Sequence, residues 1–178
     1  MSLDVVSREI QPVYAESENL PHSEVIGYSP EPGYQTLSFA RAYNWERILP
    51  QVREKYRLPL SHDIIGVHFD SVIKPDADID KLDELDELVL EEAKKIKSTG
   101  PFRLLGYLDY IKGVPDDDGN YRSSCLWVDR ESAAASLKGE AHQQAIALAR
   151  EVYSQFRLGR YILRSFPDTP KVEVIATE

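Results

Sequence analysis

The stretch IIGVHFDSVI, residues 64–73, predicts a core strand. Most of its side chains are β-branched or aromatic, and strands favour these types. It stops at Lys74-Pro75, because proline lacks the backbone N–H that a continuing central strand would need. The segments that follow decide which kind of sheet this strand belongs to.

An amphipathic helix is predicted directly after this strand. Apolar residues recur at helical spacing, namely at Leu82, Leu85, Val89, Ala93 and Ile96. Asp78 or Asp80 is expected to cap its start, and Gly100-Pro101 is expected to end it. Acidic residues crowd the first turns and lysines the last, as the helix dipole prefers. The acidic run over 76–92 therefore indicates a solvated helix face rather than a metal cluster.

The remaining segments complete an alternating order. Three more strands are predicted, at FRLLGYLDYI (102–111), YRSSCLWV (121–128) and RLGRYILRSF (157–166). The turn between the first two contains Asp118-Gly119, a strong hairpin signal. Helical sequence occupies 131–154 and is expected to break near Gly139. Strand, helix, strand, strand, helix, strand is the split βαβ pattern, so the fold class is α+β, a ferredoxin-like βαββαβ half-barrel.

Both ends of the chain add to this half-barrel. Residues 1–33 are rich in Pro, Ser and Glu and predict an irregular arm. A short strand is expected over 34–39, a helix from Asn44 to about Tyr56, and an edge strand over 172–175. The whole is expected to form one domain in two parts, an N-terminal arm and helix (1–60) packed on an α+β domain (61–178).

Composition excludes several classes of function. The 178 residues carry a formal net charge of −9, which disfavours nucleic-acid binding through a basic face. The apolar runs are too short to cross a membrane, and the N-terminus lacks the pattern of a secretory signal. The one cysteine, Cys125, allows no internal disulfide, and this favours a reducing, cytoplasmic setting.

The sequence from the third strand to the start of the last helix has a pattern found in a known superfamily. A strand ending in Leu126-Trp127 is followed by Arg130 and Glu131, and then by Gly139 and His142 in a G-x-x-H arrangement. With the βαββαβ order, this resembles the dimeric α+β barrel superfamily, and the chain is also similar to a fungal protein family without an assigned reaction. The superfamily includes cofactor-free monooxygenases, heme-degrading enzymes, dehydratases, cyclases and proteins with no known reaction. The resemblance implies a homodimer but selects no chemistry.

Three polar residues are candidates for catalysis. His68 and Asp70 share one face of the first core strand, because side chains two residues apart point the same way. A histidine beside a carboxylate can act as a general base. His142 lies near the start of the last helix, where the helix dipole favours a neutral imidazole. A purely structural role is the alternative for each. His68 and Asp70 could form a pair at the end of the strand, bonded to backbone or solvent, and His142 could be a partly exposed helix residue bonded to a nearby carbonyl or to Glu140.

Aromatic and small polar residues suggest a pocket. Tyr107 and Asp109 are expected on one face of the second strand, with Tyr110 on the other. The third strand presents Ser123, Cys125, Trp127 and Asp129 on one face, and Tyr161 lies on the last strand. Tyr107, Asp109, Trp127 and Tyr161 are therefore the predicted substrate-binding residues for a flat, largely apolar ligand. They suit a packed core or a dimer interface equally well.

The sequence predicts no metal site and no bound cofactor. It contains no dinucleotide-binding, P-loop, nucleophile-elbow or zinc-protease motif. We expect a cofactor-independent enzyme that acts on a small, largely apolar molecule by proton transfer, as in cyclisation, isomerisation, dehydration or oxygenation. The alternative is a non-catalytic homodimeric module for ligand binding or interaction. In both cases a second copy is expected to cover the sheet face that the two helices leave open.

Overall fold

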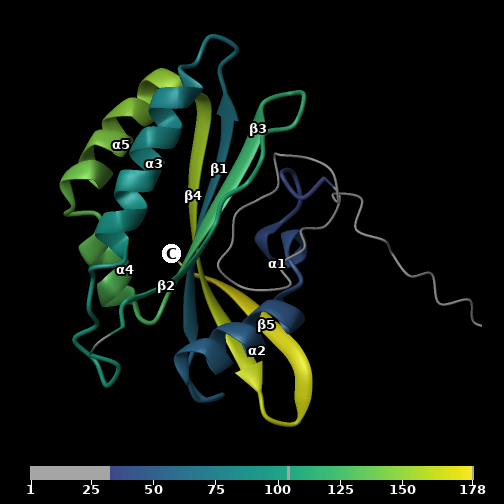
Figure 1. The fold of residues 1–178 in the computed structure, drawn as a ribbon. Coiled ribbons are helices and arrows are strands. Elements are labelled where there is room, and N and C mark those ends of the chain that lie inside the picture. Colours follow the sequence, from purple (N-terminus) through teal and green to yellow (C-terminus); the bar gives the residue numbers. More distant parts are fainter. Residues whose placement is uncertain (1–32, 104, 178) are drawn as a thin grey trace, which may run out of the picture.

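The computed structural model describes residues 33–103 and 105–177, so the arm predicted over 1–33 lies almost wholly outside the described residues. The chain forms a five-stranded antiparallel sheet with the order β2-β3-β1-β4-β5. The strands are β1 (Ile64–Ile73), β2 (Tyr107–Ile111), β3 (Asn120–Trp127), β4 (Tyr153–Phe166) and β5 (Thr169–Thr177). The first four reproduce the ferredoxin-like arrangement, and β5 adds an edge strand beside β4 (Figure 1). The α+β prediction is confirmed.

One face of the sheet is covered by α3 (Ile79–Ala93), α4 (Arg130–Ser136) and α5 (Glu140–Val152) (Figure 1). We call this the α3/α5 face. Asp78 caps α3 by accepting a hydrogen bond from Lys81 N at 3.0 Å, as its sequence position predicted. The helix ends at Ala93, earlier than the predicted stop at Gly100-Pro101, and turns follow. The predicted break at Gly139 is confirmed, since this residue is the N-cap of α5.

The opposite face is covered by α1 (Phe39–Ala42) and α2 (Trp45–Tyr56), and we call it the α1/α2 face (Figure 1). Asn44 caps α2 as predicted, by accepting a hydrogen bond from Arg47 N at 3.2 Å. The aromatic residues of this segment and the apolar side of α2 are buried against the sheet, including Phe39, Tyr43, Trp45, Ile48, Leu49 and Val52. Gly66 of β1 permits this close packing, because a Cβ there would lie 2.9 Å from Cζ of Phe39.

Two expectations about this region are corrected. The segment 34–39, expected to be a strand, forms a turn over 34–37 and then the start of α1 at Phe39. Gly33 takes a positive φ of 69°, and its carbonyl accepts a hydrogen bond from Thr36 N. The sheet face that a second copy was expected to cover is instead covered by the chain's own α1 and α2. A homodimer stays a prediction, but this face no longer gives the reason for it.

A β-bulge changes the faces of β2. The strand begins at Tyr107, later than predicted, and before it Leu105 N donates a hydrogen bond to the Phe102 carbonyl, as in a turn. The register then shifts between Tyr107 and Asp109, so that Tyr107 lies opposite Trp127 and Asp109 opposite Leu126. The extra residue interrupts the alternation of side chains. The prediction that Tyr107 and Asp109 share a face is therefore wrong. Tyr107 and Tyr110 both point to the α3/α5 face, whereas Asp109 lies opposite a core residue of the α1/α2 face.

Candidate functional site

A cavity of about 470 Å³ lies between the sheet and the helices α3 and α5. Its floor comes from alternate residues of β1 and β3, because only every second side chain of a strand faces the helices, and from Tyr107 and Tyr110 on either side of the β2 bulge. The floor and the adjoining start of β4 contribute Phe69, Ser71, Tyr107, Tyr110, Tyr121, Ser123, Cys125, Trp127, Tyr153, Ser154 and Phe156. The helices contribute mostly apolar side chains, among them Leu82, Leu85, Val89, Ala145, Ile146 and Ala149. A space of this size and character suits a small, mostly apolar molecule.

The cavity opens between α5 and the first residues of β4. Ile146 of α5 is 44% exposed and Phe156 of β4 is 48% exposed, although both line the cavity. The phenyl ring of Phe156 stacks on the ring of Tyr153, with centroids 5.8 Å apart. Two large apolar side chains therefore stand at the mouth, where a ligand would enter.

A carboxylate lies in the wall of the cavity. The hydroxyl of Tyr110 donates to both carboxylate oxygens of Asp86, at 2.8 and 3.0 Å, and Lys112 Nζ lies 3.3 Å from Asp86 Oδ2. Burial raises the pKa of Asp86, and Lys112 opposes that rise. The pKa of the Tyr110 phenol is also raised by burial. Asp86 is therefore a candidate for proton exchange with a ligand.

Of the histidines that the structure describes, His142 lines the cavity. The start of α5 is fixed by Glu92 of α3, whose carboxylate accepts hydrogen bonds from Ala141 N and His142 N at 3.0 and 3.3 Å. Burial lowers the pKa of the half-buried His142, while the nearby Glu92 carboxylate opposes this shift. The imidazole is therefore mainly neutral at pH 7, with a ring nitrogen able to accept a proton.

Cys125 also lines the cavity. Burial raises the pKa of its thiol, and the carboxylates of Asp86 and Asp109 add to the rise. The thiol therefore stays protonated at neutral pH and acts as a small apolar wall residue.

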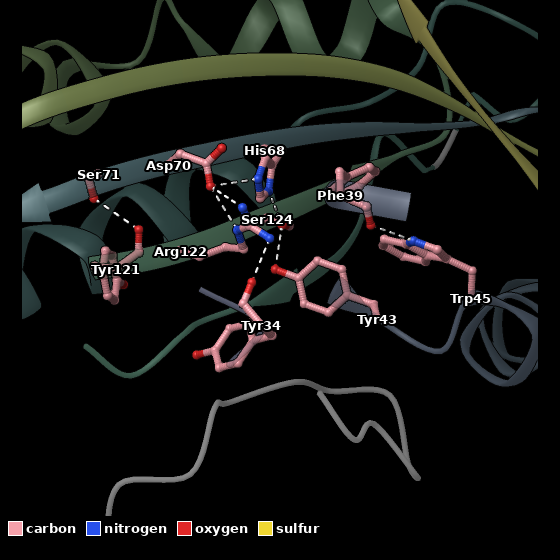
Figure 2. Close-up of polar contacts among 10 residues, drawn as sticks. All are labelled: Tyr34, Phe39, Tyr43, Trp45, His68, Asp70, Ser71, Tyr121, Arg122 and Ser124. Carbon is pink, nitrogen blue, oxygen red and sulfur yellow. Dashed lines mark hydrogen bonds and ion pairs between the residues drawn. The ribbon is translucent and has the colours of Figure 1, made fainter. Parts of the chain in front are cut away.

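A second polar group lies on the α1/α2 face, around His68 (Figure 2). His68 Nε2 lies 3.0 Å from Asp70 Oδ1, and Nδ1 lies 3.0 Å from the hydroxyl oxygen of Ser124. Arg122 donates to the same Asp70 oxygen from Nε at 2.8 Å and from Nη2 at 2.5 Å. Its Nη1 donates to the backbone carbonyl of Tyr34 at 2.6 Å. The group thus links β1 and β3 to the turn before α1.

Aromatic rings enclose this polar group. The centroid of the Phe39 ring lies 4.8 Å from that of His68 and 4.3 Å from that of Tyr161. The hydroxyl of Tyr43 is 2.9 Å from the hydroxyl of Ser124 (Figure 2). His68 is only 2% exposed, and burial lowers its pKa against the opposing effect of Asp70. Both ring nitrogens have partners, and the ring does not line the cavity on the other face.

The structure divides the predicted site residues between the two faces. Tyr107, Trp127 and His142 line the cavity. His68, Asp70 and Tyr161 lie on the α1/α2 face, as does Asp109 by its position opposite Leu126. Among the described residues, no three His, Cys, Asp or Glu side chains gather in a way that could hold a metal ion.

Sequence reasoning missed the Asp86–Tyr110 pair. A signal was present, because Asp86 follows Leu85 and precedes Val89 by three residues and so falls on the apolar side of α3. A carboxylate at an inward-facing helix position must be paired or functional. Tyr110 was assigned to the wrong face because the bulge in β2 has no clear sequence mark.

Comparisons with known proteins give a family match. A family model described as PB2B2.08-like matches residues 25–175. A Schizosaccharomyces pombe (strain 972 / ATCC 24843) protein named UPF0643 protein PB2B2.08 is 30% identical over 141 residues, covering 73% of this chain and 60% of its own length. The chain therefore spans less than two thirds of that relative.

Solved structures also match. A conserved protein from Methanosarcina mazei Go1 has a TM-score of 0.47 and 17% identity, over 60% of this chain and 97% of its own. SnoaB, a cofactor-independent oxygenase from Streptomyces nogalater, has a TM-score of 0.45 and 11% identity, over 61% and 99%. Within the part of the chain that the structure describes, no helix is both long and apolar enough to cross a membrane.

Proposed function

The chain belongs to the PB2B2.08-like family, and we propose that it is a cofactor-independent enzyme that acts on a small, largely apolar molecule by proton transfer. The proposed site is the cavity between the sheet and the helices α3 and α5. One observation carries the proposal. Two ionisable side chains in the wall of this apolar cavity, His142 and Asp86, have pKa values that burial shifts in opposite directions. These opposite shifts bring the two pKa values closer together, which favours proton exchange between the cavity wall and a ligand, and they leave the imidazole able to accept a proton.

We assign the role of base to His142. Its neutral ring would take a proton from the ligand, and the apolar surroundings would keep water from competing. Asp86, held by Tyr110 and Lys112, would orient the polar end of the ligand, and the protonated imidazole of His142 would return the proton. Tyr107 and Trp127 would form flat walls. Cyclisation, isomerisation and dehydration fit this arrangement, as does oxygenation with dioxygen as co-substrate.

His68 and Asp70 receive a different role in this proposal. Both ring nitrogens of His68 already have partners, and its ring is buried under Phe39. A base needs a free lone pair within reach of its substrate. We therefore propose that His68, Asp70 and Arg122 hold the N-terminal segment on the sheet and that the reaction takes place on the other face.

Filling the cavity tests whether it binds a ligand. Ala145 of α5 lines the cavity, whereas Ala147 of the same helix is exposed and does not. Binding of two- and three-ring aromatic ketones and phenols would be followed by tryptophan fluorescence. We expect Ala145→Phe to weaken binding about tenfold or more, which corresponds to about 1.4 kcal/mol, and Ala147→Phe to have no effect. Equal binding by both variants would contradict the assignment of the cavity.

Turnover is then measured on the compounds that bind. His142→Gln keeps a polar side chain of similar size but removes the base. We expect it to bind the compound within a few-fold of the unmodified protein, while product formation, followed by mass spectrometry, falls about 10²–10⁴-fold. Binding without any product in the unmodified protein would support the alternative, a ligand-binding module.

A further inference from the structure

The outer edge of β4 is open along its first half. β4 pairs with β1 over almost its whole length, but β5 pairs with β4 only from Arg160 to Phe166. Within residues 33–103 and 105–177, no strand pairs with the outer side of Tyr153–Gly159. An open edge presents backbone N–H and C=O groups to any strand that can reach them.

The side chains of this segment do little to protect the edge. Natural edges are blunted by lysine, proline or inward-pointing charges. Tyr153–Gly159 contains no lysine, proline or acidic residue, and Arg157 is its one charged side chain. Phe156 and Leu158 are 48% and 41% exposed, and both point to the α3/α5 face, as their partners Ser71 and Phe69 do. The edge therefore combines free backbone groups with a strip of apolar surface.

We propose that this edge pairs antiparallel with the same edge of a second copy of the chain, about a two-fold axis at Phe156. The length of the open segment sets the register of this pairing. A second strand can pair only with Tyr153–Gly159, because β5 occupies the edge from Arg160 onwards and α5 ends at Val152. Phe156 is the central residue of this segment, with three residues on either side. In this register the two Phe156 side chains lie opposite each other, and Arg157 lies opposite Gln155 of the partner subunit. In this register no two like charges lie directly opposite each other, and such pairs would destabilise antiparallel strands.

A second copy of the chain is the binding partner that best fits the open edge, because the segment Tyr153–Gly159 can pair with itself. Only a self-complementary segment can form a two-fold contact, since the same patch must serve both sides. Here the central position is aromatic, and facing aromatic side chains stabilise antiparallel strands. Helices α3 and α5 of both copies would lie on one side of a continuous ten-stranded sheet, twice the five strands of each chain.

The proposed contact also bears on the cavity. Phe156 lines the cavity mouth together with Ile146. Phe156 of the partner subunit would then stand beside this mouth and complete its rim. The interface does not depend on what the cavity binds, so its test is independent of the proposed reaction.

Sedimentation equilibrium at micromolar concentration tests the interface. The unmodified chain is expected to have about twice the 20.3 kDa mass of one copy. Phe156→Lys would place two like charges opposite each other and is expected to sediment as a monomer. Leu88→Lys is the matched control, because Leu88 is 56% exposed on α3, away from the edge, and this variant should stay dimeric. A monomeric unmodified chain, or a dimer that survives Phe156→Lys, would overturn the proposal.

Cysteine cross-linking tests the register. Residues opposite each other in an antiparallel pair have Cα atoms about 4.5–5.5 Å apart, within the range that a disulfide spans. Phe156→Cys is therefore expected to give a covalent dimer on mild oxidation. Leu158→Cys should not, because its two copies would lie about 13 Å apart in this register. Cross-linking of the two variants to equal extents would contradict the axis at Phe156, and a complex with another protein in place of the dimer would overturn the proposal.

Discussion

His68 and His142 lie on opposite faces of the same sheet. His68 points from β1 towards Phe39 of α1, whereas His142 points from α5 into the cavity. The sheet between them prevents the two imidazoles from acting on one ligand. The structure therefore places one histidine in a buried, hydrogen-bonded group and the other in the wall of a cavity.

The first prediction compares these two residues by stability. His68→Ala removes one hydrogen-bond partner each from Asp70 and Ser124, which keep Arg122 and Tyr43, and it leaves a space under Phe39. The free energy of unfolding is therefore expected to fall by about 1–3 kcal/mol through lost hydrogen bonds and lost packing. His142→Ala is expected to cost about 1 kcal/mol or less, because its ring is only half-buried. Urea denaturation measures both, and equal losses would contradict the separation of roles.

The second prediction concerns pH. The pKa values of His68 and His142 are lowered in the folded state, so the unfolded chain binds protons more readily below about pH 6.5. The contribution of the two neutral histidines to the free energy of unfolding is therefore complete above that pH. It falls as the pH drops, by at most about 1.4 kcal/mol per pH unit for each histidine. Asp70, whose pKa is also lowered, adds its loss only below about pH 4.

Urea denaturation at pH 7.5 and pH 5.5 checks this sign. The loss of stability on acidification should be smaller in His68→Gln, which cannot take up a proton. A protein that becomes more stable on acidification would show instead that Asp70 holds His68 in its charged form.

The third prediction concerns the ion pair between Arg122 and Asp70. Arg122 is 3% exposed, so Arg122→Met leaves a partly buried carboxylate without its cation. The free energy of unfolding is expected to fall by about 2 kcal/mol or more. Breaking a fully buried pair costs about 3–5 kcal/mol, and the loss here should be smaller because the Asp70 side chain is 27% exposed. The double variant Arg122→Met/Asp70→Leu should recover part of this loss. Additive losses in the double-mutant cycle would mean that the two side chains do not interact.

The fourth prediction concerns the carboxylate in the cavity. Lys112 lowers the pKa of Asp86 against the effect of burial, so Lys112→Met should raise that pKa further. NMR titration of the carboxyl carbon measures the shift. Lys94→Met is the control, because Lys94 pairs with the exposed Glu91 on α3. An unchanged Asp86 pKa in Lys112→Met would show that solvent screens the lysine.

Much of the fold follows from local sequence. The bounds of β1 and the cap at Asn44 were predicted correctly, because β-branched runs and capping residues act over a few residues. The turn at 34–37 was missed because its one aromatic residue, Tyr34, is held by contacts with segments distant in sequence. Tyr34, for example, accepts a hydrogen bond from Val114 N. Tertiary contacts of this kind override local propensity.

The candidate site was less predictable than the fold. The cavity brings together Tyr107, Trp127 and His142, three of the seven predicted site residues, since each position follows from the alternation of a strand or from its place in a helix. Their roles stay predictions. His68 was assigned to the same site because the sequence gives the faces of a strand but not which face is covered by which helices. Only the packing of α1 and α2 on the sheet decides this question.

The packing of α1 on the sheet also constrains how the protein is made. The chain leaves the ribosome from its N-terminus, so Tyr34 and Phe39 emerge well before Arg122 and Tyr161, the residues that hold them in place. Until β3 and β4 have been synthesised, the aromatic side chains of α1 and α2 have no sheet to cover. A nascent chain that stalls before β4 would expose this cluster to aggregation. Chaperone capture during translation is therefore expected to be strongest on ribosomes that have not yet synthesised β4.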